Sequence, residues 1–159
     1  MKELKGDILL INKGIICHQV NCLGIMGKGI AKQIKEKFPE VFNDYRDFCN
    51  RILNQYGSRY EALGMFRISS ICDSLHIANI FGQGGIGCKR RETKYDAVDE
   101  SLNKLKNLLI SNCCKLKVFF PKRMGCCLGG GNWDIYYEII KSHFPDGIIV
   151  DYEKGKVPL

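Results

Sequence analysis

The hydrophobic and polar positions of this chain follow two periods, one typical of short strands and one typical of amphipathic helices. Short apolar runs rich in β-forming residues predict strands at 4–11, 14–20, 65–72, 75–81, 118–121 and 147–152. Apolar residues three and four positions apart predict helices at 28–38, at 39–52, from an N-cap at Thr93 to about Ser111, and at 132–144. Strands that alternate with helices predict an α/β fold, in which a mixed, mainly parallel sheet lies between layers of helices.

Length and composition favour one ordinary globular domain. The 159 residues can bury a sizeable core, and 45% hydrophobic with 26% charged residues is usual for such a domain. Apolar runs fall far short of the roughly 20 residues of a membrane span, and the N-terminus lacks the apolar core of a secretory signal. We therefore expect a single domain over 1–159 that is cytoplasmic, monomeric and without membrane contact.

The nine cysteines predict neither disulfides nor a metal site. Their number is odd, and Cys17 and Cys72 lie in apolar runs in which a thiol simply packs. Cys113-Cys114 and Cys126-Cys127 are adjacent pairs, whereas zinc sites favour two or more residues between ligands. We expect reduced cysteines, no metal and no cofactor.

The segment 21–31, NCLGIMGKGIA, joins a predicted strand to a predicted helix through three glycines. Gly24, Gly27 and Gly29 allow a sharp turn, and their N–H groups can converge on an anion at the positive end of the helix. The segment lacks the Lys and the Ser or Thr of a Walker A loop, and it lacks the third glycine of the dinucleotide fingerprint. A phosphate loop and a plain tight turn are both consistent with this segment alone.

The same design occurs again late in the chain. The predicted strand 118–121 runs into KRMGCCLGGGNW at 122–133 and then into a helix. In a parallel sheet both loops would emerge at the carboxyl edge, where open α/β sheets bind their ligands. Two glycine loops at one edge can hold a diphosphate between them.

At these segments the chain resembles the macrodomain, a family that binds ADP-ribose. The resemblance is carried by Gly6-Asp7-Ile8, the 21–31 loop, the strand 76–81 and the run from Gly125 to Trp133, in that order over nearly the whole chain. It is strongest with small bacterial and phage-type members related to the yeast ADP-ribose 1''-phosphate phosphatase and the terminal ADP-ribose protein glycohydrolase. The resemblance implies a three-layer α/β/α macrodomain-like fold with a mixed, mainly parallel six-stranded sheet.

The resemblance also implies a set of ligand contacts. Asp7 would accept a hydrogen bond from the amine of adenine and Tyr152 would cover the base, although a turn carboxylate and an edge tyrosine need no ligand. Asn21 would orient a ribose hydroxyl or a catalytic water, or else it closes an Asx turn. Phe81 begins a glycine-rich loop that either closes over the distal ribose or merely connects two elements. The expected ligand-binding residues are Asp7, Ile8, Asn21, Gly27, Gly29, Ile30, Phe81, Gly125, Cys126, Cys127, Leu128, Gly129, Gly130, Gly131 and Tyr152.

The chain departs from the glycohydrolase branch at two positions. That branch uses a lysine before the third helix and an aspartate in the second glycine loop, whereas Glu92 and Gly129 stand at the matching positions. Lys89 or Lys94 is the candidate substitute for the lysine, and the candidate catalytic residues are Asn21 and Lys89. Without a nucleophile and its carboxylate partner, catalysis would depend on positioning and on stabilisation of charge.

Three functional hypotheses remain at this point. The first is ADP-ribose binding with hydrolysis of a group from its distal ribose, either as an ADP-ribose 1''-phosphate phosphatase or by removal of ADP-ribose from modified macromolecules. The second is a non-catalytic ADP-ribose-binding module. The third is a nucleic-acid-binding domain, which the formal charge of +7 and the cluster Lys89-Arg90-Arg91 would suit. Aromatic residues do not interleave with the basic ones, which favours a small phosphorylated ligand.

Overall fold

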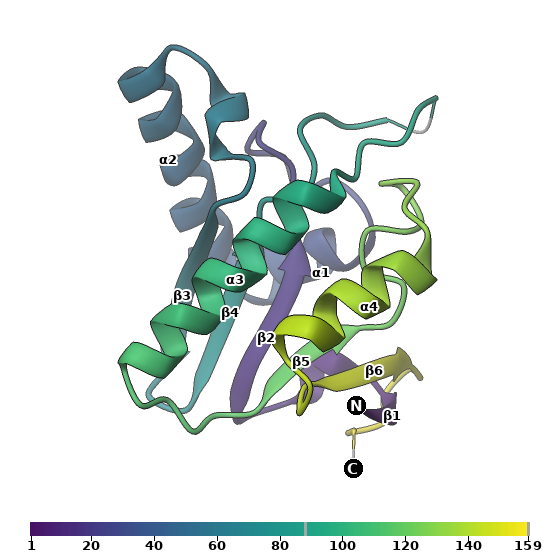
Figure 1. Ribbon diagram of the computed structural model, residues 1–159. Helices are drawn as coiled ribbons and strands as arrows, with labels where there is room; N and C mark the ends of the chain where they lie inside the picture. Colours follow the sequence, from purple (N-terminus) through teal and green to yellow (C-terminus); the bar gives the residue numbers. More distant parts are fainter. Residues whose placement is uncertain (88, 159) are drawn as a thin grey trace.

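The computed structural model describes residues 1–87 and 89–158, and its central feature is a six-stranded sheet (Figure 1). The strands are β1 (Lys2–Gly6), β2 (Gly14–Gln19), β3 (Phe66–Cys72), β4 (Leu75–Ile80), β5 (Val118–Pro121) and β6 (Ile148–Tyr152). The helices are α1 (Gly29–Lys37), α2 (Pro39–Tyr56), α3 (Tyr95–Ser111) and α4 (Trp133–His143), with short 3-10 helices η1 (Ile8–Leu10) and η2 (Arg59–Ala62).

The strand order is β1-β6-β5-β2-β4-β3, and every neighbouring pair is parallel except β3 with β4. The predicted mixed, mainly parallel sheet of six strands is therefore confirmed. The antiparallel pair β3 and β4 forms a hairpin, with its turn at Asp73 and Ser74. Because β2, β5, β6 and β1 are parallel, their carboxyl ends lie along one edge of the sheet.

Two helices cover each face of the sheet, which gives three layers (Figure 1). Side chains alternate along β2, so that Ile15 and Cys17 belong to the core under α3 and α4, whereas Ile16 belongs to the core under α1. The larger core also contains Leu102 of α3 and Ile140 of α4, both fully buried. Strands buried on both faces explain why they read as nearly continuous apolar runs.

The predicted first strand, 4–11, is wrong at its second half. The strand ends at Gly6, and the chain turns into η1 because the Asp7 carboxylate accepts a hydrogen bond of 3.0 Å from the Leu9 N–H. The apolar pattern correctly predicts that Ile8 and Leu9 are buried, but it does not predict the turn. The turn brings Asp7 and Ile8 to the edge of the sheet where the strands end.

The predicted N-cap of α3 is also wrong. Lys94 occupies the N-cap position of α3 and makes no side-chain capping bond. Thr93 is fully buried, and its hydroxyl donates instead to the Gly125 carbonyl at 2.7 Å. At α4 the expected boundary is correct, since Asn132 caps the helix by accepting from the N–H groups of Asp134 and Ile135.

Eight of the cysteines are described, and each of them has a free thiol; Cys88 lies outside the described residues. Cys17 is buried as expected, and burial raises its pKa. Cys72 is exposed, contrary to the expectation, because it ends the edge strand β3. No helix among the described residues has both the length and the apolar character that crossing a membrane requires.

His18 is a fully buried core residue, as its place within a strand predicts. Its Nε2 lies 2.6 Å from Asn79 Oδ1, and since that oxygen can only accept, Nε2 carries the proton. Within the described residues Nδ1 has no hydrogen-bond partner. Burial lowers the pKa of His18 from 6.5 to about 4, so the ring is neutral at pH 7.

This pKa predicts a loss of stability on mild acidification. Between pH 6.5 and 4 the unfolded chain binds a proton at His18 that the folded protein does not, so the free energy of unfolding falls as the pH falls. The expected loss between pH 7 and 5 is about 2 kcal/mol. Urea unfolding at both pH values would measure it, with His18→Gln as the non-titrating control. An equal pH dependence in the two proteins would contradict the prediction.

Candidate functional site

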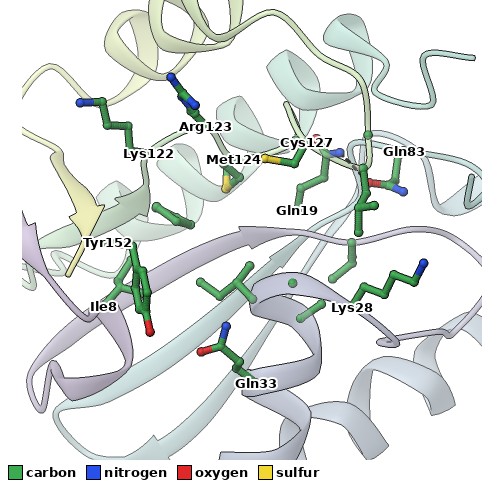
Figure 2. Close-up of a pocket in the computed structure, with 18 of the residues that line it drawn as sticks. Ile8, Gln19, Lys28, Gln33, Gln83, Lys122, Arg123, Met124, Cys127 and Tyr152 are labelled. Atoms are coloured by element: carbon green, nitrogen blue, oxygen red, sulfur yellow. Dashed lines mark hydrogen bonds between the residues drawn. The ribbon is translucent and has the colours of Figure 1, made fainter. Parts of the chain in front are cut away.

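A pocket of about 900 Å³ lies at the carboxyl edge of the sheet. Its walls come from the ends of β1, β2, β5 and β6 and from four connections: η1, the first glycine loop (21–31), the second glycine loop (122–131) and the loop 82–87. The two glycine loops lie on opposite sides of this one pocket (Figure 2). The prediction that both loops emerge at the same sheet edge is confirmed.

The first glycine loop is shaped by the Asn21 side chain. Its Oδ1 accepts hydrogen bonds from the Leu23 N–H at 2.9 Å and from the Tyr45 hydroxyl at 2.8 Å, while its Nδ2 donates to the Ile25 carbonyl at 2.7 Å. The side chain therefore closes an Asx turn, one of the two roles considered from the sequence. Asn21 also lines the pocket, and among the described residues one hydrogen of its amide has no acceptor, so it can donate to a ligand or a water.

Helix α1 begins at the pocket without a side-chain cap. Its N-cap residue is Lys28, and Gly29 follows in the left-handed conformation, with φ +59°. The first N–H groups of a helix have no acceptor within the helix, and none is found among the described residues for Gly29, Ile30 or Ala31. All three residues line the pocket. The pocket therefore receives unpaired N–H donors together with the positive end of the helix dipole.

The second glycine loop divides its N–H groups into two sets. Those of Cys126, Gly130 and Gly131 bond to carbonyls within the loop, at 3.0, 3.3 and 2.9 Å. The second set finds no acceptor among the described residues and consists of Gly125, Cys127, Leu128 and Gly129. The same four residues line the pocket, and the first three do not. The residues of this loop whose N–H groups have no acceptor among the described residues are thus residues that line the cavity.

The charges of the pocket lining are mainly positive. Among the described lining residues Asp7 is the one acid, whereas Lys28, Lys122 and Arg123 are basic. Figure 2 shows Lys28 on one side of the pocket and the other two on the opposite side. Lys122 is neutralised by Glu3 and Asp151, at 2.6 and 3.0 Å. The remaining cations and the free N–H groups make a site for an anion.

One end of the pocket is apolar. Ile8 of η1 and Tyr152 at the end of β6 are drawn next to each other in Figure 2, and the Tyr152 residue is 61% exposed. Asp7, beside them, contributes the carboxylate that also caps η1. An aliphatic wall, an aromatic face and one acceptor are suited to a purine base.

Most of the expected ligand-binding residues line this pocket. They are Asp7, Ile8, Asn21, Gly27, Gly29, Ile30, Gly125, Cys127, Leu128, Gly129 and Tyr152. Cys126, Gly130 and Gly131 lie in the second loop but not on the cavity wall. Lys89 is exposed and does not line the pocket either.

The structure does not bring Phe81 to the pocket. Its ring is fully buried on the α2 side of the sheet, with centroids 5.8 Å from Tyr45 and 5.3 Å from Phe48. Side chains alternate at the end of β4, and Phe81 faces the aromatic cluster. From the same loop it is Gln83, Ile86 and Gly87 that line the cavity.

The position of the lysine in the glycohydrolase branch is filled by a structural carboxylate. Glu92 is buried, its Oε1 lies 2.7 Å from Arg90 Nε, and its Oε2 accepts from the Gly85 N–H at 3.3 Å. The hydrogen bond from Arg90 holds the pKa of Glu92 below its ordinary value. Glu92 therefore ties the loop 82–87 to the segment before α3 and does not line the pocket.

Sequence reasoning missed several lining residues, above all Gln19 and Gln33. Gln33 lies on α1, one turn beyond the glycines, where a helical wheel shows an exposed polar residue and nothing more. Gln19 carried a signal, because it is a polar residue at the end of a strand whose first four residues are Gly, Ile, Ile and Cys. A buried polar side chain must find partners, and such a position marks a network.

Comparison with known proteins gives no match to a protein-family model. A DNA ADP-ribosyl glycohydrolase of Mycobacterium tuberculosis is 46% identical over 46 residues, or 29% of this chain and 13% of that protein. An ADP-ribose 1''-phosphate phosphatase of Neosartorya fischeri is 40% identical over 60 residues, or 37% of this chain and 30% of that protein. The matches thus span less than a third of either enzyme.

Other similarities extend over the whole chain. An uncharacterized 17.5 kDa protein of Enterobacteria phage T4 is 28% identical, over 96% of this chain and 97% of its own length. The macrodomain of Mycobacterium tuberculosis DarG superposes with a TM-score of 0.72 and 27% identity, covering 94% of this chain and 95% of that one. A Bacteroides thetaiotaomicron protein of unknown function reaches a TM-score of 0.79 at 27% identity, over 96% and 97%. The fold, the paired glycine loops and these similarities together show that the chain has a macrodomain fold.

Proposed function

We propose that this protein binds ADP-ribose, with the diphosphate held between the start of α1 and the second glycine loop. One observation carries the proposal. The start of α1 and the second glycine loop each contain N–H groups that have no acceptor among the described residues, and these N–H groups belong to residues that line the pocket on both of its sides. A diphosphate presents acceptor oxygens in two directions, so it can use both sets at once.

The rest of the ligand follows from the two ends of the pocket. The adenine lies at the apolar end, against Ile8 and Tyr152, with its exocyclic amine toward the Asp7 carboxylate. The distal ribose lies toward Asn21 and the loop 82–87, at the other end. This orientation agrees with the macrodomain resemblance.

We further propose that the protein hydrolyses a group attached to that ribose, the 1''-phosphate ahead of an ester link to a modified macromolecule. In the phosphatase reaction a water oxygen bonds to phosphorus as the bond from phosphorus to the ribose oxygen breaks. One water proton passes to the leaving oxygen, which yields ADP-ribose and inorganic phosphate. We assign the second hydrogen of the Asn21 amide, which is not used in the bond to Ile25, to orienting the water, and the loop N–H groups to stabilising the developing charge.

Attack by a lysine has little support in this chain. Lys89 does not line the pocket, Glu92 is engaged with Arg90 and Gly85, and Gly129 carries no carboxylate. The names of two relatives, an ADP-ribose 1''-phosphate phosphatase and a DNA ADP-ribosyl glycohydrolase, support hydrolysis at the distal ribose in general. These names support two alternatives for the group that is removed from the ribose, a phosphate or a macromolecule.

A binding-only module is the second candidate, and one observation favours it. The single acid among the described lining residues is Asp7, which lies at the adenine end, so the distal end has no carboxylate to act as a base. Such a module would show the same affinity for ADP-ribose without any turnover.

Calorimetry with ADP-ribose, followed by incubation with ADP-ribose 1''-phosphate and with ADP-ribosylated protein and DNA, tests both proposals. We expect saturable 1:1 binding and release of inorganic phosphate from the first substrate. Binding of ADP-ribose without turnover of any substrate would support the non-catalytic binding module instead of the hydrolase. Absence of ADP-ribose binding, together with steeply salt-dependent binding of oligonucleotides, would replace both with a nucleic-acid-binding function.

A further inference from the structure

Gln19, at the carboxyl end of β2, is the centre of a buried polar network that joins the walls of the pocket. Its Nε2 donates to Thr93 Oγ1 at 2.9 Å and to Gln83 Oε1 at 2.8 Å. Its Oε1 accepts from the hydroxyl of the fully buried Tyr136 at 3.0 Å. Figure 2 shows Gln19 and Gln83 facing each other. Both amide hydrogens are used, so Gln19 has no donor left for a ligand.

One branch of the network reaches the second glycine loop. The Thr93 hydroxyl accepts from Gln19 and passes its own hydrogen to the Gly125 carbonyl at 2.7 Å. The same carbonyl accepts from the Gly131 N–H at 2.9 Å. The network thus holds the Gly125 carbonyl, which joins the two ends of the loop, and the pocket-lining residues 127–129 lie between these ends.

The loop also rests directly on the network. A Cβ atom added at Gly129 would lie 2.4 Å from Thr93 Oγ1 and 3.0 Å from Gln19 Nε2, and one added at Gly125 would lie 2.6 Å from Gln19 Oε1. These approaches are possible only without side chains. The Gln19 amide and the Thr93 hydroxyl therefore limit where the backbone of this loop can lie.

The other branch reaches the opposite wall. Gln83 Nε2 donates to the Gly85 carbonyl at 2.9 Å, and the neighbouring Gly84 carbonyl accepts from the Cys22 N–H in the first glycine loop at 3.0 Å. A single amide is thus connected by hydrogen bonds to the second glycine loop, and through Gln83 to the loop 82–87 that holds the first.

The geometry points to Gln19 and Thr93 as positioning residues that set the second glycine loop for the diphosphate before any ligand arrives. The inference rests on the proposed function for the identity of the ligand. Preorganised donors bind an anion without the cost of ordering the loop, so weakening the network should reduce affinity even in a folded protein. Neither side chain needs to touch the diphosphate for this effect.

The test compares two substitutions at Thr93. Thr93→Val keeps the shape and removes the hydroxyl, and we expect about a tenfold loss of ADP-ribose affinity. Thr93→Ser restores the hydroxyl and should bind within twofold of the unmodified protein. Gln19 acts through Thr93, so the effects of the two substitutions should overlap. The double variant Gln19→Met, Thr93→Val should therefore lose less ADP-ribose affinity than the product of the losses in the two single variants.

Ser101→Ala is the matched control for stability. Ser101 is also fully buried, and its hydroxyl donates to the Met65 carbonyl at 2.7 Å, but away from the pocket. We expect it to lower the melting temperature about as much as Thr93→Val while leaving ADP-ribose affinity unchanged. An equal loss of affinity in both variants, or affinity within twofold in Thr93→Val, would overturn the inference.

Hydrogen exchange in the ligand-free protein separates this inference from the proposed function. The Gly130 and Gly131 N–H groups are hydrogen-bonded within the loop, and they should exchange faster in Thr93→Val than in Ser101→Ala. If the unmodified protein failed to bind ADP-ribose, the proposed function would fail, while faster exchange would still support the positioning role. Unchanged exchange would reject that role whatever the ligand.

Discussion

Replacement of Gly29 by glutamate is expected to reduce ADP-ribose affinity at least about a hundredfold in a protein that still folds. A Cβ at this position meets no atom within 4 Å, so no clash results, and the left-handed φ of +59° costs only about 1 to 2 kcal/mol. The new carboxylate would lie at the positive end of α1, where it both repels the diphosphate and competes for the same N–H groups. Calorimetry would measure the loss.

Gly29→Ala is the control for this substitution. Alanine causes the same backbone strain, but its side chain is short and uncharged, so this variant should lose far less affinity for ADP-ribose. Thermal unfolding would confirm that both variants fold to a similar degree. If the glutamate and alanine variants bound ADP-ribose equally well, the diphosphate would not lie at the start of α1.

Introduction of aspartate at Gly129 is expected to destroy the site rather than to create a glycohydrolase. Aspartate is the residue of the glycohydrolase branch at this position, yet here its Cβ would lie 2.4 Å from Thr93 Oγ1 and 2.6 Å from the Gly125 carbonyl oxygen. Both neighbours are held in the buried network, so the cost is expected to reach several kcal/mol. Thermal unfolding and release of ADP-ribose from modified protein would measure the two effects.

Leu128→Asp provides the comparison for the charge alone. Leu128 is exposed in the same loop, so a carboxylate there causes no clash. This variant should unfold near the temperature of the unmodified protein, whereas Gly129→Asp should not. A stable Gly129→Asp protein that removes ADP-ribose from protein faster than the unmodified one would show that the loop can open to admit the residue.

The order of the elements could be predicted because it depends on local patterns. Apolar runs of strand length and helical spacing gave the order of the strands and helices, and two strand-loop-helix units predicted two loops at one edge. The errors occurred where one side chain overrides the pattern. Asp7 turns the first strand into η1, and Thr93 bonds to the second glycine loop instead of capping α3.

The parts of the site that depend on tertiary contacts could not be predicted. Gln19 meets Thr93 and Gln83 across 74 and 64 residues of sequence, and no periodicity reports such a meeting. The resemblance named Phe81 as a contact because of its place in the chain, but the alternation of side chains turns its ring toward Tyr45. A shift of one residue in register turns a side chain to the other face of the sheet, and a sequence motif does not fix this register.

The chain also shows that a pocket in the macrodomain fold can form without the lysine and the aspartate of the glycohydrolase branch. The donors that we propose for the diphosphate are backbone N–H groups, so they do not require particular side chains at 127 or 128. What the loop does require is a glycine where it contacts the network, as at Gly129. Under the proposed function, ADP-ribose binding does not depend on the chemistry of a catalytic lysine, and this chain has backbone donors for such binding.

A crystal structure with ADP-ribose tests the central claim most directly. We expect a single pyrophosphate within hydrogen-bond distance of N–H groups from both 29–31 and 127–129, with the adenine between Ile8 and Tyr152. A pyrophosphate that contacts only one of the two loops, or a nucleotide bound outside this pocket, would contradict it.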